Sequence, residues 1–172
     1  MQVRVPTRRL NVKCSSCGEE HPADELELTF RRPDAIIELP AEDFLTRVKE
    51  DADRAAIDGE RFFLRGTLPL PVPERGSDYA IGIWVEVAPA TFWRVIELWT
   101  SEDQADEPPF AATLANQIPL LPPTLGLQVA MKLTGPTTRP EFHLAAVEHP
   151  IYREQTAGIT AHRIHEYTAL FA

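Results

Sequence analysis

The chain has 172 residues, of which 44% are hydrophobic and 25% are charged, and its formal net charge is −9. No apolar run approaches the roughly 20 residues of a membrane-spanning helix, and two cysteines are too few for a scaffold built on disulfides. The acidic balance argues against a nucleic-acid-binding surface. We therefore expect an acidic, soluble protein of one domain that has neither a membrane nor a nucleic acid as its partner.

The chain begins with a basic stretch, because residues 1–12 contain Arg4, Arg8 and Arg9 and no acidic residue. No apolar segment of the kind found in a secretory signal follows this stretch. We interpret 1–12 as a basic N-terminal arm and 13–172 as a single domain. We expect a cytoplasmic location, where cysteines stay reduced unless they serve redox chemistry or bind a metal.

Apolar and polar residues alternate along much of the chain, a period that predicts strands. The strands are expected over 26–30, 61–72, 79–87, 110–117, 125–133 and 141–147. The second and third of these should pair as an antiparallel hairpin. Pro69, Pro71 and Pro73 alternate through the end of 61–72, and proline cannot donate a hydrogen bond to a neighbouring strand. That end of the strand should therefore lie at a sheet edge or leave the sheet.

Apolar residues spaced by three and four predict a few short helices between and after the strands. They are expected over 41–53, from Pro89 to Trp99, from Pro150, and after Gly158, where Thr160 is the predicted N-cap. Strands outnumber helices, and tight turns join consecutive strands. The predicted fold class is α+β: a single domain with a mostly antiparallel sheet, a few short helices and an N-terminal C-x-x-C knuckle.

The sharpest local signal is the segment CSSCGEEH, in which Cys14, Cys17 and His21 follow the pattern C-x2-C-x3-H. A C-x-x-C turn followed by glycine directs two thiolates at one metal, for which zinc is the natural choice. A closed zinc site needs four ligands, and the chain has no other cysteine. The fourth ligand would be water, a carboxylate, a group from a second chain, or one of the other histidines: His143, His149, His162 and His165.

Two other interpretations of this segment stay open. Cys14 and Cys17 would also suit a reduced pair in a tight turn without metal, or a redox pair at the start of a helix.

His162 and His165 stand three residues apart on a predicted helix, a spacing that metals use and that solvated helices also show. His149 precedes Pro150 at a strand-to-helix junction, where it would cap the helix or reach into a cleft.

No motif of a hydrolase or nucleotide-binding enzyme is present: the chain lacks G-x-S-x-G, H-E-x-x-H, a Walker loop and G-x-G-x-x-G. Trp84, Trp93 and Trp99 would line a ligand pocket or, as we favour, belong to the core. Enzymatic activity therefore has no support from a motif.

Seven separated segments together resemble a bacterial domain-of-unknown-function family, the one numbered 2199. They are CSSCGEEH, FFLRG at 62–66, GIWV at 82–85, ELW at 97–99, PPF at 108–110, RP at 139–140, and HPI at 149–151 with the EQ and GI steps that follow it. The resemblance extends from about Lys13 to Tyr167. It implies a small bacterial cytoplasmic protein and no activity.

The resemblance also draws attention to Arg65, Trp84 and His149, which belong to its segments. One hypothesis is that Cys14, Cys17, His21 and His149 converge on a metal. The alternative, which we favour slightly, is that His149 and Arg65 hold turns and strand ends by hydrogen bonds.

The function that the sequence supports best is a binding or interaction module with a zinc knuckle. The acidic segment 101–107 would suit a basic protein partner. One alternative is a zinc-dependent hydrolase, in which His149 or Glu154 would act as the base. The other is a thiol redox protein that uses Cys14 and Cys17.

Overall fold

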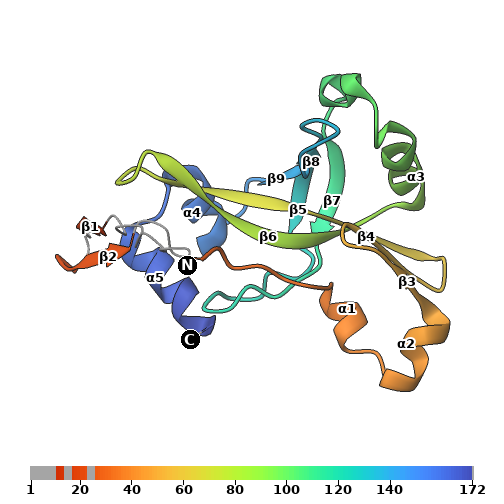
Figure 1. Cartoon of the computed structure of the whole chain (residues 1–172), viewed down its shortest axis with the longest axis horizontal. Helices are drawn as coiled ribbons and strands as arrows, with labels where there is room; N and C mark the ends of the chain where they lie inside the picture. The colour runs from red at the N-terminus through yellow and green to blue at the C-terminus, as the bar shows by residue number, and fades with distance from the viewer. Residues whose placement is uncertain (1–10, 14–16, 23–25, 172) are drawn as a thin grey trace, which may run out of the picture.

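The computed structural model of the chain describes residues 11–13, 17–22 and 26–171, and one long hairpin runs between its two lobes (Figure 1). The hairpin consists of β5 (Arg61–Val72) and β6 (Ser77–Val87), which pair along their whole length as predicted. Cys14 and residues 1–10 of the predicted basic arm lie outside the described residues.

Three further strands close this hairpin into a barrel. β7 (Phe110–Leu114), β8 (Gln128–Lys132) and β9 (Glu141–Leu144) continue the sheet with antiparallel pairings, and β9 then returns to lie parallel to β5. The sheet is therefore mixed, which corrects the prediction of a mostly antiparallel sheet. Turn lengths indicate which neighbouring strands pair, but a parallel return depends on where a distant strand ends in space.

The barrel closes at Gly66, where β5 and β9 approach most closely. A Cβ atom on this glycine would lie 2.4 Å from the carbonyl oxygen of Pro140 and 2.5 Å from the ring of Phe142. Its neighbour Thr67 donates its backbone N–H to the same Pro140 oxygen over 2.9 Å. Only glycine leaves room for this contact.

Alternation along the hairpin separates two apolar clusters. Residues such as Leu64 and Leu68 of β5 and Ile81 of β6 point into the barrel and form the main core. The opposite face carries Phe63 and Trp84, which belong to a smaller second cluster. The long predicted strands thus bury both of their faces over part of their length.

The predicted helix over 41–53 is shorter than expected. After α1 (Asp34–Ile37), helix α2 covers Ala41–Arg47, and the chain then forms β3 (Val48–Glu50) and β4 (Arg54–Ile57). The Asp51 carboxylate accepts hydrogen bonds from the backbone N–H groups of Asp53 and Arg54, each over 2.9 Å. This side-chain turn reverses the chain and replaces the last helical turns with a hairpin.

The other predicted helices are confirmed. They are α3 (Pro89–Leu98), α4 (Pro150–Ala157) and α5 (Ala161–Thr168), and a 3-10 turn, η2 (Ala169–Phe171), follows them. The acidic loop after α3 forms a short 3-10 helix, η1 (Glu102–Asp106), around the buried side chain of Gln104. In the described part of the chain, none of the helices combines the length and apolar character needed to cross a membrane.

The predicted strand over 26–30 is reduced to a single bridge between Thr29 and Gly82. Leu28 of this segment is nevertheless buried, and its backbone N–H donates to the hydroxyl of Tyr79 over 2.6 Å. The alternating pattern here reflects burial against β6 rather than a full ladder.

The proline-rich end of β5 lies at a sheet edge, as predicted, and the C-terminal helices cover that edge. Gln155 of α4 donates to the carbonyl oxygen of Pro69 over 3.2 Å, and the Ile159 backbone N–H donates to that of Pro71 over 2.8 Å. Gly158 has a φ of +89°, and a Cβ atom there would lie 2.8 Å from the Pro71 oxygen. This close contact fixes where α5 begins.

Candidate metal centre

The N-terminal motif lies on a small ribbon of its own. β1 (Asn11–Lys13) and β2 (Glu20–Pro22) pair as an antiparallel ribbon that lies beside α5 (Figure 1). Gly18, with a φ of +76°, turns the chain between Cys17 and β2. Cys17 is exposed, whereas His21 is only 5% exposed. A histidine this well buried on a peripheral ribbon is covered by another part of the chain.

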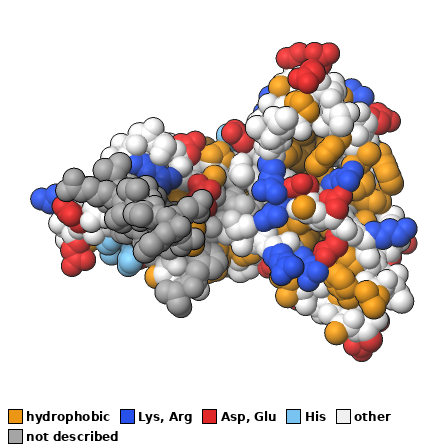
Figure 2. Space-filling model, viewed as in Figure 1, with side chains coloured by type: hydrophobic (Ala, Val, Ile, Leu, Met, Phe, Trp, Pro, Cys, Tyr) orange, Lys and Arg blue, Asp and Glu red, His pale blue; other side chains and the backbone are white. Residues whose placement is uncertain are grey.

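Helix α5 supplies that cover. Its N-cap is Thr160, as predicted, whose hydroxyl accepts a hydrogen bond from the backbone N–H of Arg163 over 3.2 Å. One face of α5 buries Ile164 and Tyr167 against the domain. The histidines of the helix lie near the ribbon, and histidine side chains reach the surface in that region (Figure 2).

Cys17, His21 and His162 bring one ligand atom each into a common space. These three atoms all lie within 4.8 Å of one another. Cys17 Sγ and His21 Nε2 are 3.3 Å apart. In a tetrahedral zinc site, bonds of about 2.0–2.3 Å place neighbouring ligand atoms roughly 3.3–3.8 Å apart. The thiol and imidazole therefore stand at the spacing of two zinc ligands.

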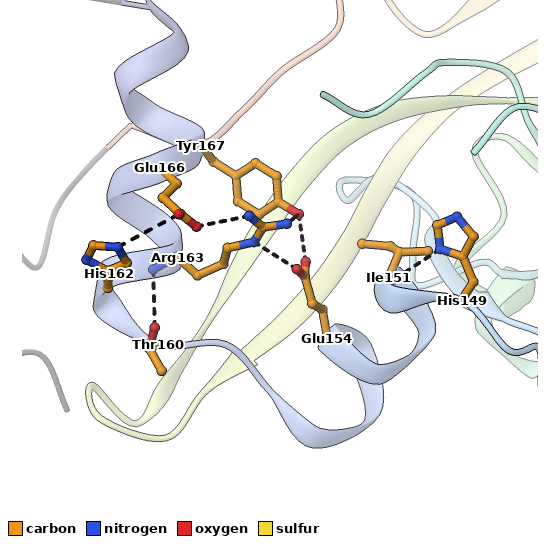
Figure 3. A network of polar contacts seen from close by, with 8 residues as sticks. All are labelled: His149, Ile151, Glu154, Thr160, His162, Arg163, Glu166 and Tyr167. Atoms are coloured by element: carbon orange, nitrogen blue, oxygen red, sulfur yellow. Dashed lines mark hydrogen bonds and ion pairs between the residues drawn. The ribbon is translucent and has the colours of Figure 1, made fainter. Parts of the chain in front are cut away.

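His162 is oriented for a third bond. Its Nε2 lies 3.8 Å from Oε1 of Glu166, one turn further along α5 (Figure 3). Its Nδ1 is buried and has no hydrogen-bond partner in the described part of the chain. A carboxylate beside one ring nitrogen favours the tautomer that leaves the other nitrogen as an acceptor, and metal-bound histidines commonly have such a neighbour. The orphaned Nδ1 is thus the expected ligand atom.

A third histidine completes the packing around His21. The ring of His165 stacks on that of His21 with centroids 4.9 Å apart, and the ring of His162 meets it edge-on at 5.7 Å. These two contacts fix the orientation of the His21 ring. His165 is itself exposed. Both histidines of α5, His162 and His165, therefore face the ribbon.

Partly buried polar groups connect α5 to α4 behind the histidines. Glu154 of α4 accepts a hydrogen bond from Nε of Arg163 over 2.8 Å and another from the hydroxyl of Tyr167 over 2.6 Å (Figure 3). Burial raises the pKa of Tyr167, and the Glu154 carboxylate raises it further. Burial disfavours the charge of Arg163, but hydrogen bonds to Glu166 and Glu154 outweigh this and raise its pKa. This network holds α5 in place while its histidines face the ribbon.

The structure does not bring His149 into this group. His149 is the N-cap of α4: its Nδ1 accepts a hydrogen bond from the backbone N–H of Ile151 over 3.1 Å. Its Nε2 lies 3.2 Å from the carbonyl oxygen of Pro123. Both ring nitrogens are engaged with backbone groups, which matches the capping interpretation of this residue and not its convergence with Cys17 and His21.

The other candidate positions also lie away from the metal-ligating group. Trp84 is buried in the second apolar cluster, and its indole N–H donates to the carbonyl oxygen of Phe30 over 3.2 Å. Arg65 lies on β5, where it donates to the carbonyl oxygen of Ala52 over 3.3 Å. Neither side chain is part of the Cys17 group.

The core expectation that we favoured is wrong for Trp93, whereas Trp99 packs against the main core. Trp93 is 56% exposed, and Trp99 is half-buried. Each lines a surface pocket, Trp93 beside α3 and Trp99 near η1. The Arg54 guanidinium lies over the Trp99 ring, 5.2 Å from its centroid, so Trp99 meets its pocket with only part of its surface.

Sequence reasoning named His162 only as one alternative for the fourth ligand. The signal was present, because His162 and His165 stand three residues apart directly after the predicted N-cap Thr160. The sequence does not reveal that β5 packs against the segment around Gly158, and this packing brings α5 to the ribbon. A separation of about 140 residues between His21 and His162 gives no local pattern.

Among known proteins, the chain matches one family model, described as an uncharacterized protein conserved in bacteria (DUF2199), over residues 13–159. The match includes Cys14, Cys17 and His21 and ends just before α5. No curated protein and no solved structure matches the chain.

Proposed function

The chain belongs to the bacterial family DUF2199, and from that premise we propose that it is a zinc-binding interaction module. In this proposal, zinc fastens the N-terminal ribbon to the C-terminal helix α5. The observation that carries the proposal is the convergence of Cys17, His21 and His162 within 4.8 Å. A thiolate with two imidazoles is a ligand set that binds zinc in preference to magnesium or calcium.

The fourth ligand in this proposal is Cys14. It stands three residues before Cys17 in the C-x-x-C pattern, and it lies outside the described residues. A Cys2His2 site would then be closed, with the four protein ligands of structural zinc sites. His162 takes the place that the sequence hypothesis had given to His149.

A closed site fits a structural role better than a catalytic one. A zinc hydrolase needs an open coordination position and a base beside the bound water. Glu154, the base considered from the sequence, already accepts hydrogen bonds on both carboxylate oxygens, from Arg163 and from Tyr167. The geometry therefore supplies no support for Glu154 as a base at the metal.

The partner that we propose is a basic protein surface. The side chains of Glu102, Asp103 and Asp106 are exposed at η1, and Figure 2 shows acidic atoms at the tip of the lobe that carries this segment. Such a patch would favour a basic partner and lose affinity as salt rises. We also retain the cytoplasmic location as a proposal, since a thiolate zinc site requires reduced cysteines.

Cobalt substitution tests both the site and its closure. A tetrahedral Co²⁺ site with a thiolate ligand gives strong visible bands and a near-ultraviolet charge-transfer band. We expect both in the wild type and in His143→Ala, a control at a half-exposed histidine of β9. Cys17→Ser should lose about half of the charge-transfer intensity, because Cys14 keeps one thiolate, and the double variant Cys14→Ser/Cys17→Ser should lose all of it. Visible bands that shift when azide is added would reveal an exchangeable coordination position and would favour the hydrolase alternative. No cobalt binding, together with a Cys14–Cys17 disulfide that forms reversibly, would favour the thiol redox alternative.

A further inference from the structure

A polar pocket of about 680 Å³ lies in the lobe opposite the metal centre. Its walls are Asp53 before β4, Thr67 of β5, Trp99 after α3, Gln104 of η1 and the loop 133–141 between β8 and β9. This volume lies in the range of about 300–1,000 Å³ that small-molecule sites occupy. The pocket therefore has the size of a metabolite site, and its charged groups indicate what it would hold.

Arg139 presents unused hydrogen-bond donors in this pocket. Its Nε donates to Oδ1 of Asp53 over 2.7 Å, and its side chain is 47% exposed. In the described part of the chain, no group accepts a hydrogen bond from either terminal nitrogen of Arg139. Asp53 thus fixes the plane of the guanidinium while its two terminal nitrogens stay available for a bidentate oxyanion.

A second arginine, Arg65, lies close to Arg139 and Asp53. Arg65 shares a face of β5 with Thr67, and its Nε is buried without a hydrogen-bond partner among the described residues. It forms no ion pair among the described residues, although the Asp53 carboxylate is near enough to favour its charge. Burial lowers the pKa of Arg65, and the charge of Arg139 lowers it further. Two guanidinium groups therefore share the single carboxylate of Asp53.

The carboxylate on the other side of the pocket has its own partner. Oε2 of Glu141 lies 3.4 Å from Nε2 of His143. Lys132, which pairs with Glu141 across β8 and β9, donates to the carbonyl oxygens of Ala105 and Glu107, each over 2.6 Å. An anionic group would consequently bind at the Arg139 end, and neutral donors of the same ligand would face Glu141.

The walls of the pocket are held in place without a ligand. Gln104 donates to the carbonyl oxygen of Trp99 over 3.1 Å, which ties η1 to the end of α3. Across the pocket, the hydroxyls of Thr134 and Thr138 lie 2.6 Å apart, and Thr134 also donates to the carbonyl oxygen of Arg139 over 2.9 Å. A preformed site loses little conformational freedom on binding.

We propose that this pocket binds a small organic anion, a carboxylate or a phosphate ester, whose anionic group meets Arg139 and whose body lies against Trp99. The proposal goes beyond the function proposed above, because it names a second kind of ligand at a different site, and it does not depend on the metal. The shared chemistry is the oxyanion, and the choice between carboxylate and phosphate is left to the measurement.

Isothermal titration calorimetry of the full chain with citrate, adenosine monophosphate and inorganic phosphate tests the proposal. We expect citrate or adenosine monophosphate to bind, and the one that binds identifies the oxyanion as carboxylate or phosphate. Arg139→Gln should weaken that binding at least tenfold. Arg61→Gln, which also removes a half-exposed arginine from an ion pair with a carboxylate, should leave it unchanged.

Three results would overturn the proposal. The first is that none of the three probes binds, and the second is that Arg139→Gln binds as tightly as the wild type. The third is that inorganic phosphate binds as tightly as adenosine monophosphate, which would remove the role of Trp99. Arg139→Lys guards against a folding defect, because it keeps the charge and should lose only part of the affinity. The zinc content of each variant is measured alongside, so that failure of the anion site and failure of the metal site are distinguished.

Discussion

Cys17 Sγ lies 3.3 Å from Nε2 of His21, four residues further along the chain. A thiol–imidazole hydrogen bond would have a similar length, so this distance alone does not require a metal. The third group supports the proposed zinc site, because His162 brings a buried Nδ1 that has no hydrogen-bond partner in the described part of the chain. A zinc ion accounts for all three ligand atoms at once.

Zinc removal should release the ribbon without unfolding the barrel. Asn11, Lys13 and Glu20 of the ribbon are exposed, whereas α5 contributes Ile164 and Tyr167 to the main core. We expect a chelator to raise amide hydrogen exchange in 17–22 at least tenfold and to leave the exchange of β5 and β6 unchanged. Equal exchange in 17–22 with and without chelator would contradict this coupling.

The Glu154 network should be important for stability. Glu154 is 15% exposed and accepts charge-assisted hydrogen bonds from Arg163 and Tyr167. We expect Glu154→Gln to lower the free energy of unfolding by about 1.5–3 kcal/mol in urea denaturation. Glu97→Gln, at a 69% exposed carboxylate that pairs with Arg94, serves as the control and should change it by less than about 0.5 kcal/mol. A similar effect of both substitutions would contradict the role of the network.

The raised pKa of Tyr167 predicts a loss of stability at alkaline pH. Burial and the Glu154 carboxylate hold the proton on the folded-state hydroxyl, whereas tyrosine in the unfolded chain releases it near pH 10. Above that pH the unfolded state binds fewer protons than the folded state, so the free energy of unfolding falls as pH rises. We expect Tyr167→Phe to show a shallower fall between about pH 9 and pH 11. An identical slope in wild type and variant would refute this assignment.

Closure of the barrel should depend on Gly66. An added Cβ would approach the Pro140 carbonyl oxygen and the Phe142 ring closer than atoms can lie. We expect Gly66→Ala to cost about 3 kcal/mol or more of unfolding free energy. Gly82→Ala is the comparison and should cost less, because its Cβ would meet the Thr29 side chain at 3.0 Å, a tight contact rather than an overlap with backbone. Equal costs at both sites would show that the β5–β9 contact is not a constraint.

The hairpin and the helices after Pro89, Pro150 and Gly158 could be predicted because their signals are local. Alternation, a proline in the first turn and the Thr160 cap each act within a few residues. The β3–β4 hairpin was missed because the Asp51 turn overrides a helical spacing of apolar residues. The parallel β5–β9 pairing was missed because its signal in the sequence is a single residue, Gly66. The chain has eight glycines, and nothing in the sequence sets this one apart.

The candidate site could be predicted only in part, because only part of it is a local motif. Cys17 and His21 form a local motif, and the structure brings them together. His149 was preferred over His162 because it belongs to the segments that carry the family resemblance, whereas in the structure it caps α4. The ligand from α5 reaches the ribbon only through tertiary packing, which no spacing within the chain encodes.

Zinc content in two histidine variants tests the central claim most directly. Tag-free wild type, His162→Ala and His149→Ala are purified and measured by elemental analysis. We predict about one zinc per chain in the wild type and in His149→Ala, which loses only a helix cap worth roughly 1 kcal/mol, and a large loss of zinc in His162→Ala. Full zinc in His162→Ala, or its loss in His149→Ala alone, would contradict the metal centre described here.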